Sequence, residues 1–179
     1  MSFLRRIVAA GLRAVRAFAR RRDGGTALEF AMIAPIFVVL IFATAQTAII
    51  YLAEAYLETA AEDAARTVLT NQATSMTASQ FQTAVCNDMP ALFTCGNVMV
   101  NLTPAASETS INTSTPTFNS NGTLANPTTY TMPIPGQIAV LQVFYEWPVI
   151  GLPLGFNFGN LGNGAYLMLS TQVFIVEAQ

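Results

Sequence analysis

Side chains capable of acid–base, nucleophilic or metal chemistry are scarce in this sequence. Its 179 residues contain no histidine, so the commonest general base and the commonest metal ligand are missing. The adjacent carboxylates Glu62 and Asp63 point to different sides of a helix, and Glu146 ends a predicted strand, where an acid is usually solvated. Serine and threonine are plentiful but have no visible base to activate them. We therefore expect no enzyme, no cofactor, no metal site and no small-molecule substrate.

The two cysteines, Cys86 and Cys95, are the remaining candidates for covalent chemistry. Two thiols without histidine or a second cysteine pair make a poor zinc site, whereas export of the chain would favour a disulfide between them. Such a bond would contribute about 2–3 kcal/mol of stability. Two reduced, buried thiols are the alternative.

Charge is distributed very unevenly along the chain. Only 10% of the residues are charged, whereas about 25% are charged in ordinary soluble domains. Seven of the eight arginines lie in the first 22 residues, so residues 1–24 carry a net charge of +6 and residues 25–179 carry −8. The acidic C-terminal part argues against nucleic acid as a partner.

One long helix organises the N-terminal part of the chain. Residues 30–53 form an uncharged run of 24 residues, FAMIAPIFVVLIFATAQTAIIYLA, bounded by Glu29 and Glu54. A helix of that length spans about 36 Å, enough to cross a membrane. By the positive-inside rule, the arginine-rich side stays cytoplasmic and everything after Ala53 faces the periplasm or the exterior. We expect the protein in the inner membrane, crossing it once.

The helix is predicted to continue beyond the membrane. Glu54, Glu58, Glu62 and Arg66 recur every four residues on one face. The opposite side carries small or aliphatic residues that suit close packing, namely Leu57, Ala61, Ala64 and Val68.

The C-terminal part has strand patterns around an exposed tract. Alternating apolar residues predict strands near 98–102, 139–145 and 167–175, the last with Leu167, Leu169, Val173 and Ile175 on one apolar face. Residues 101–133 are rich in Ser, Thr, Asn and Pro and predict a long surface loop. The expected fold class is α+β, in which the long helix covers a small antiparallel sheet of about three strands. We expect a leader at 1–24, the helix at 25–70 and a β-containing domain at 71–179.

The junction RRRDGGTALEF, residues 20–30, is the most informative stretch. Its glycines predict an extended bond accessible to a protease, and Glu29 stands at the entrance of an apolar helix. A membrane-buried acid costs about 2.5–3.5 kcal/mol and needs a partner. Cleavage between Gly24 and Gly25 would create an amine four residues before Glu29, on the same helix face.

These residues resemble known families. The basic leader, the glycine before the cut and Glu29 as the fifth mature residue resemble the prepilin-peptidase signal of type IV pilins. Residues 25–35, GTALEFAMIAP, resemble the TadE family signature Gly-x-x-x-Glu-Phe-Ala-x-x-x-Pro. The stretches 135–148 and 152–164 are similar to the ends of alphaproteobacterial TadE proteins. Near the C-terminus the family commonly has Phe-Arg-Asn-Glu-Pro, whereas residues 174–178 read FIVEA.

The resemblance implies a pseudopilin or minor pilin of a Tad system, which assembles Flp-type (type IVc) pili for surface adhesion. It implies cleavage by a prepilin peptidase, with other Tad pilins and pseudopilins and an inner-membrane assembly platform as further partners. Glu29 would pair with the N-terminal amine of its own or a neighbouring subunit. Pro35 should kink or loosen the helix, because it frees the carbonyl of Ala31.

Three other readings of the N-terminal region remain open. An uncleaved, TadG-like anchor would keep the leader and bind a partner or the cell wall through its periplasmic domain. A signal peptidase I site at Ala43-Thr-Ala45 would release a soluble protein that starts at Gln46. The arginine-rich start also resembles a mitochondrial presequence in composition, although Asp23 and the immediate apolar helix disfavour it.

Overall fold

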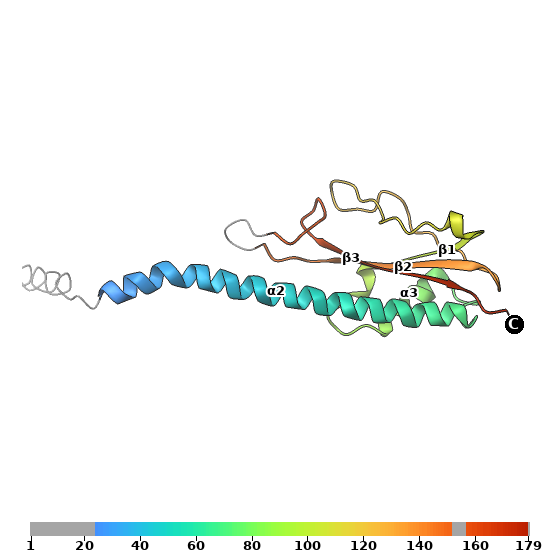
Figure 1. Cartoon of the computed structure of the whole chain (residues 1–179), viewed down its shortest axis with the longest axis horizontal. Coiled ribbons are helices and arrows are strands. Elements are labelled where there is room, and N and C mark those ends of the chain that lie inside the picture. The colour runs from blue at the N-terminus through green and yellow to red at the C-terminus, as the bar shows by residue number, and fades with distance from the viewer. Residues whose placement is uncertain (1–23, 152–156, 179) are drawn as a thin grey trace, which may run out of the picture. The chain divides into compact units, whose positions relative to one another are not determined.

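A computed structural model describes residues 24–151 and 157–178 (Figure 1). The predicted leader, except Gly24, and residues 152–156 of the C-terminal resemblance lie outside the described residues. The chain divides after Ala43 into two units, and the sheet belongs to the second. The observed class is α+β, as predicted.

Helix α2 spans Gly24–Leu69, 46 residues, and it contains Pro35. It is the helix among the described residues that is long and apolar enough to cross a membrane. Its end is a Schellman motif, because the amide of Asn71 donates to the Val68 carbonyl and the amide of Gln72 to the Thr67 carbonyl. Asn71 has φ 60°, a left-handed conformation that asparagine tolerates better than most residues. The prediction that the helix runs past the membrane segment is confirmed.

Three antiparallel strands form a sheet in the order β1-β2-β3. Strand β1 is Val98–Ala105, β2 is Ile138–Trp147 and β3 is Tyr166–Ile175. Val143 in the middle of β2 lies opposite Val100 of β1 and Ser170 of β3. Central strand β2 is apolar on both faces, and its residues from Ala139 to Tyr145 are all buried.

The core lies between one face of this sheet and the second part of α2. Helix residues of the core are small or aliphatic: Ile50, Ala53, Leu57, Ala60, Ala61, Ala64, Ala65 and Val68. They pack with alternate strand residues, including Val98, Val100, Leu102, Leu141, Val143 and Met168. The sheet is therefore covered by the part of α2 from Ile50 to Val68, as predicted.

Strand β3 faces the helix with different residues from those that its apolar pattern indicates. Met168 and Ser170 are buried, whereas Val173 and Ile175 are exposed. The expectation that β3 packs with the face that carries Leu167 and Val173 is wrong. The strand packs with its other face, because successive side chains of a strand point to opposite sides of the sheet. Pairing with β2 decides the face, since Met168 lies opposite Tyr145 and Ser170 opposite Val143.

A short helix before β1 carries the first cysteine. Helix α3, Ala78–Asn87, begins with a capping box in which Thr77 and Gln80 each satisfy the other's backbone amide. Cys86 is buried on this helix and forms a disulfide with Cys95, with 5.4 Å between the Cα atoms. Cys95 opens the 3₁₀ turn η1, Cys95–Asn97, that leads into β1; a second 3₁₀ turn, η2, spans Glu108–Ser110. The disulfide thus ties α3 to the start of the sheet.

Candidate functional site

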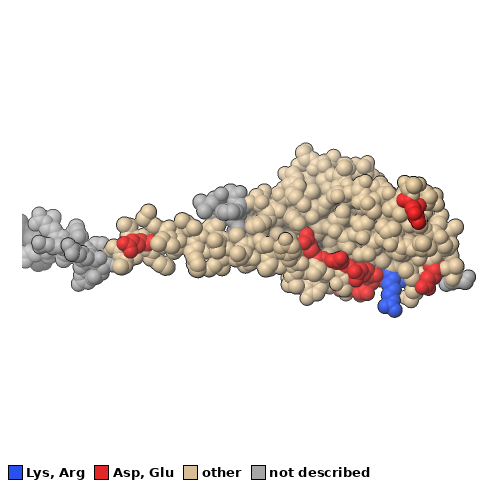
Figure 2. Space-filling view, viewed as in Figure 1, with Lys and Arg blue, Asp and Glu red and all other residues tan. Residues whose placement is uncertain are grey.

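The first part of α2 is an exposed apolar surface. Except for the half-buried Val39, the large hydrophobic side chains from Leu28 to Phe42 are 46–73% exposed, and the span is not buried inside the protein. Glu29 is also exposed and is the single charged residue between Gly24 and Ala53. Figure 2 shows an uncharged stretch of helix between two acidic regions on the face it draws. This segment has the properties of a surface covered by lipid or by other apolar helices.

Gly24 and Gly25 begin helix α2. The extended bond expected between them is not present, because both residues are helical in the described chain. Gly25 has open space around it, with no atom within 4 Å of an added Cβ. Glycine weakens a helix relative to alanine, so two glycines at this end make the first turn less stable.

Glu29 and Pro35 follow in the same exposed part of the helix. Glu29 lies one helical turn after Gly25, so a charge at residue 25 would be its neighbour. Pro35 is exposed and removes one backbone hydrogen bond from the apolar part of α2. Its effect on the direction of the helix stays a prediction.

An acidic stripe follows on the second part of α2 and appears as a red line in Figure 2. Glu58, Glu62 and Asp63 are exposed, whereas Glu54 is half-buried beside the sheet. Tyr166 of β3 donates a hydrogen bond to Glu54 Oε1 at 2.9 Å. This hydrogen bond, together with burial, raises the pKa of Tyr166. Glu54 thus fastens the sheet to the helix.

Glu146, the other carboxylate considered for catalysis, lies at the end of β2. Glu146 accepts a hydrogen bond from Asn163 Nδ2 at 3.2 Å, a contact that holds the loop between β2 and β3. Within residues 24–151 and 157–178, no group of three or more His, Cys, Asp or Glu side chains could hold a metal ion. The contact of Glu146 with Asn163 is of a structural kind.

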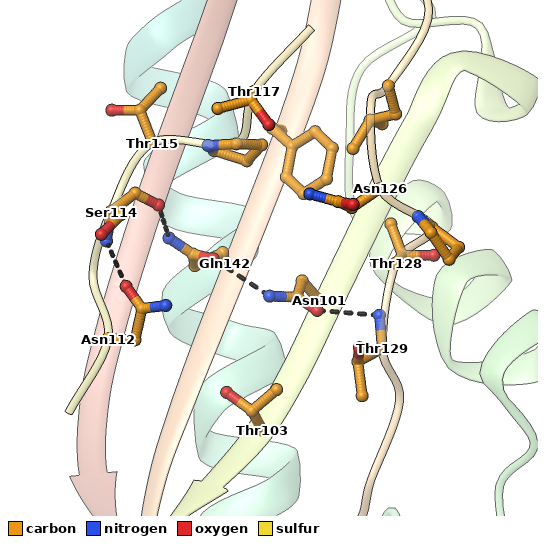
Figure 3. A pocket seen from close by; sticks show the side chains of 14 residues that line it. Asn101, Thr103, Asn112, Ser114, Thr115, Thr117, Asn126, Thr128, Thr129 and Gln142 are labelled. Carbon is orange, nitrogen blue, oxygen red and sulfur yellow. Dashed lines mark hydrogen bonds between the residues drawn. The ribbon is translucent and has the colours of Figure 1, made fainter. Parts of the chain in front are cut away.

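A polar pocket of about 400 Å³ opens on the sheet face opposite the helix (Figure 3). Gln142 of β2 lies at its base, 3% exposed, and donates to the Ser114 carbonyl at 3.0 Å. It accepts from Asn101 Nδ2 at 3.1 Å, and Asn101 Oδ1 in turn accepts from the Thr129 amide at 2.8 Å. This chain of bonds holds both arms of the Ser/Thr/Asn-rich tract on the sheet.

Sequence reasoning missed this network, although a signal was present. Gln142 interrupts the apolar run AVLQVFY, and a buried amide needs partners in the fold. The pocket is lined by neutral side chains, so among the described residues it contains no acid or base for catalysis. Its polar groups serve to attach the tract.

A single exposed apolar helix that could span a membrane and continues into an α+β domain fits a pilin-like, single-pass membrane protein. The family model described as TadE-like protein matches residues 24–66, and this segment is similar to TadE-like proteins. The match begins at Gly24 and ends in the helix that packs on the sheet. No curated protein and no solved structure matches the chain. The family match supports a pilin-like protein associated with a Tad pilus.

Proposed function

We propose that this chain is the precursor of a TadE-like minor pilin, or pseudopilin, of a Tad (Flp, type IVc) pilus. A prepilin peptidase removes residues 1–24, and the mature subunit starts at Gly25. It then leaves the inner membrane through the assembly platform and joins other Tad pilins at the tip or base of the pilus. Packing between helices, not catalysis, is the activity, and surface adhesion is its result.

The observation that carries this proposal is the exposed apolar half of α2 with one carboxylate near its start. The family match covers this segment and begins at the proposed cleavage site. Large exposed apolar side chains need lipid before assembly and neighbouring helices after it. A helix that is smooth and apolar all round satisfies both surroundings.

Glu29 is the residue expected to drive the transfer. Cleavage after Gly24 creates an α-amine at Gly25, which is positively charged at neutral pH. An unpaired acid at the membrane is costly, so Glu29 gains free energy when this amine or that of a neighbouring subunit pairs with it. The uncut precursor has no amine at that position, which couples processing to assembly.

The disulfide supports export of the C-terminal domain. Disulfides persist in the periplasm and outside the cell, but rarely in the cytosol. Cys86 and Cys95 are joined within the domain that follows the helix. With the arginine-rich leader on the cytoplasmic side, this domain lies in the periplasm before assembly.

The decisive experiment is N-terminal sequencing of the protein recovered from membranes and from sheared pili. A start at Gly25 is expected. A start at Met1 would replace the proposal with an uncleaved, TadG-like anchor, and a start at Gln46 would indicate signal peptidase I and a released domain.

Two variants separate processing from assembly. Gly24→Ala should block cleavage, whereas Glu29→Ala should be cleaved but absent from sheared pili. Glu62→Ala is the matched control, because Glu62 is an exposed acid on the same helix outside the apolar segment. Normal incorporation of Glu29→Ala would refute the pairing of Glu29 with the amine.

A further inference from the structure

We propose that residues 147–151, the last residue of β2 and the segment that follows it, lie in the outer membrane–water interface and anchor the sheet domain on the lipid surface. We call this segment the interface loop. The proposal rests on the proposed membrane span of α2. It adds a second lipid contact, distant in sequence from the helix, that holds the domain on the membrane before the subunit is assembled.

The interface loop is bonded to the helix inside its uncharged run. With its amide oriented to pair, Gln46 donates from Nε2 to the Ile150 carbonyl at 3.2 Å and accepts from the Ile150 amide at 3.1 Å. Gln46 lies within residues 30–53, where a polar side chain needs a partner. The two bonds satisfy both the glutamine and the loop backbone, as apolar surroundings require.

The helix length places this contact at the membrane. A hydrocarbon core about 30 Å thick takes about 20 helical residues. A span that begins at Phe30 therefore ends near Ile50, about 6 Å beyond Gln46 along the helix. The Gln46–Ile150 contact is then level with the outer edge of the hydrocarbon.

The surface around this contact is apolar and exposed. Ile150 is 76% exposed, the highest value among the large hydrophobic side chains described. On the helix, Ile49, Tyr51 and Leu52 are also exposed. Aromatic residues such as Tyr51 are enriched at membrane–water interfaces. Lipid would cover these side chains, whereas water would leave them exposed at a cost.

The distribution of charged residues also favours contact of the interface loop with lipid. The chain carries no charged residue between Glu146 and Glu177. The connection between β2 and β3 therefore has no charged side chain that would oppose contact with lipid. The acidic stripe of α2 begins only at Glu54, after the end of the estimated span. The change from uncharged to acidic surface therefore falls at the expected boundary.

Quenching of tryptophan fluorescence by brominated lipids tests the proposal in the full-length protein. Trp147 is the one tryptophan, so Trp147→Phe provides a background without signal. Adding Ile150→Trp places the probe in the interface loop, and adding Ile134→Trp provides the matched control. Ile134 is 64% exposed in a turn beside Val176, which adjoins Leu69 at the far end of α2. Leu69 lies about 35 Å from Gln46 along the helix.

Phe37→Trp in the same background reports separately whether α2 spans the vesicle. All three proteins are reconstituted in phosphatidylcholine vesicles, with and without bromine on the acyl chains. We expect brominated lipid to remove most of the emission of Phe37→Trp and Ile150→Trp, and to leave that of Ile134→Trp unchanged. Emission of Ile150→Trp should also be shifted to shorter wavelength relative to Ile134→Trp.

Three outcomes would overturn the proposal. Quenching of Phe37→Trp without quenching of Ile150→Trp would refute the interface loop and leave the membrane span intact. Absence of quenching in Phe37→Trp would refute the span and the inference together. A blue-shifted Ile150→Trp emission that resists brominated lipid and grows with the protein-to-lipid ratio would assign the loop to a neighbouring protein.

Discussion

The two parts of helix α2 have opposite surroundings. From Leu28 to Phe42 all large side chains but Val39 are exposed, whereas from Ile50 to Val68 one face is buried under the sheet. The exposed part carries Phe, Ile, Val and Leu in all directions, and the buried part presents mainly alanine to the sheet. One continuous helix thus combines a surface for lipid or other helices with a packing surface for its own domain.

Side-chain size explains how the second part is covered. Alanines at 53, 60, 61 and 64 are at most 4% exposed, and Leu57 fills the space between them. Short side chains let the helix approach the strands closely. On its other side the same part carries Glu58 and Glu62, which remain in water. The exposed part has no such polar side, so nothing within its own sequence distinguishes an inner from an outer face.

The largest expected difference between the two parts concerns Leu57 and Leu40. Leu57→Ala should lower the free energy of unfolding by about 2–5 kcal/mol, because it leaves a cavity under the sheet. Leu40→Ala, at a position 58% exposed, should leave it nearly unchanged. Urea unfolding of the detergent-solubilised protein, followed by Trp147 fluorescence, measures both. Equal effects would mean that the two parts do not differ in packing.

A smaller effect is expected from overpacking the alanine face. Ala61 is fully buried against the sheet, so Ala61→Leu should cost about 1–3 kcal/mol. Ala55→Leu makes the same change on the exposed side of the helix and is the matched control. The same urea titration applies, and a stability of Ala61→Leu equal to that of Ala55→Leu would show that close approach is not required.

The smallest effect concerns the hydrogen bond between Tyr166 and Glu54. Tyr166→Phe should cost about 0.5–1.5 kcal/mol at neutral pH. Because the pKa of Tyr166 is raised in the folded protein, its contribution is complete below about pH 10, the pKa of free tyrosine. It is lost as the pH rises through the higher folded value.

Thermal unfolding between pH 7 and pH 11 checks this dependence. The unmodified protein should lose more stability on the alkaline side than Tyr166→Phe does. Tyr56 is an exposed tyrosine of helix α2, so the alkaline curve of Tyr56→Phe should follow that of the unmodified protein. Identical alkaline curves for Tyr166→Phe and the unmodified protein would exclude this bond as a source of stability.

Local patterns predicted much of the fold. The uncharged run and the four-residue spacing after it indicated one long helix, and α2 extends through both. Period-two alternation located all three strands, because a half-covered sheet imposes that period. Helix α3 was not predicted, since its ten residues have a weak apolar pattern and its start depends on the Thr77–Gln80 cap.

The packed face of β3 and the polar pocket depend on long-range pairing. Both faces of β3 carry apolar residues, so alternation alone selected the wrong one; its register with β2 brings Met168 to the core. Gln142, Asn101 and Ser114 meet only because the tract folds back over the sheet. No local pattern contains that information.

The sequence by itself determined the elements and the charge layout, because both follow from the order of residues along one segment. It placed the uncharged helix, the lone Glu29 and the acidic part that follows. Only the tertiary structure decided which side chains are covered, since burial depends on partners distant in the chain. Leu57 lies under the sheet, Gln46 is bonded to the backbone of Ile150, and the apolar surface from Leu28 to Phe42 remains exposed.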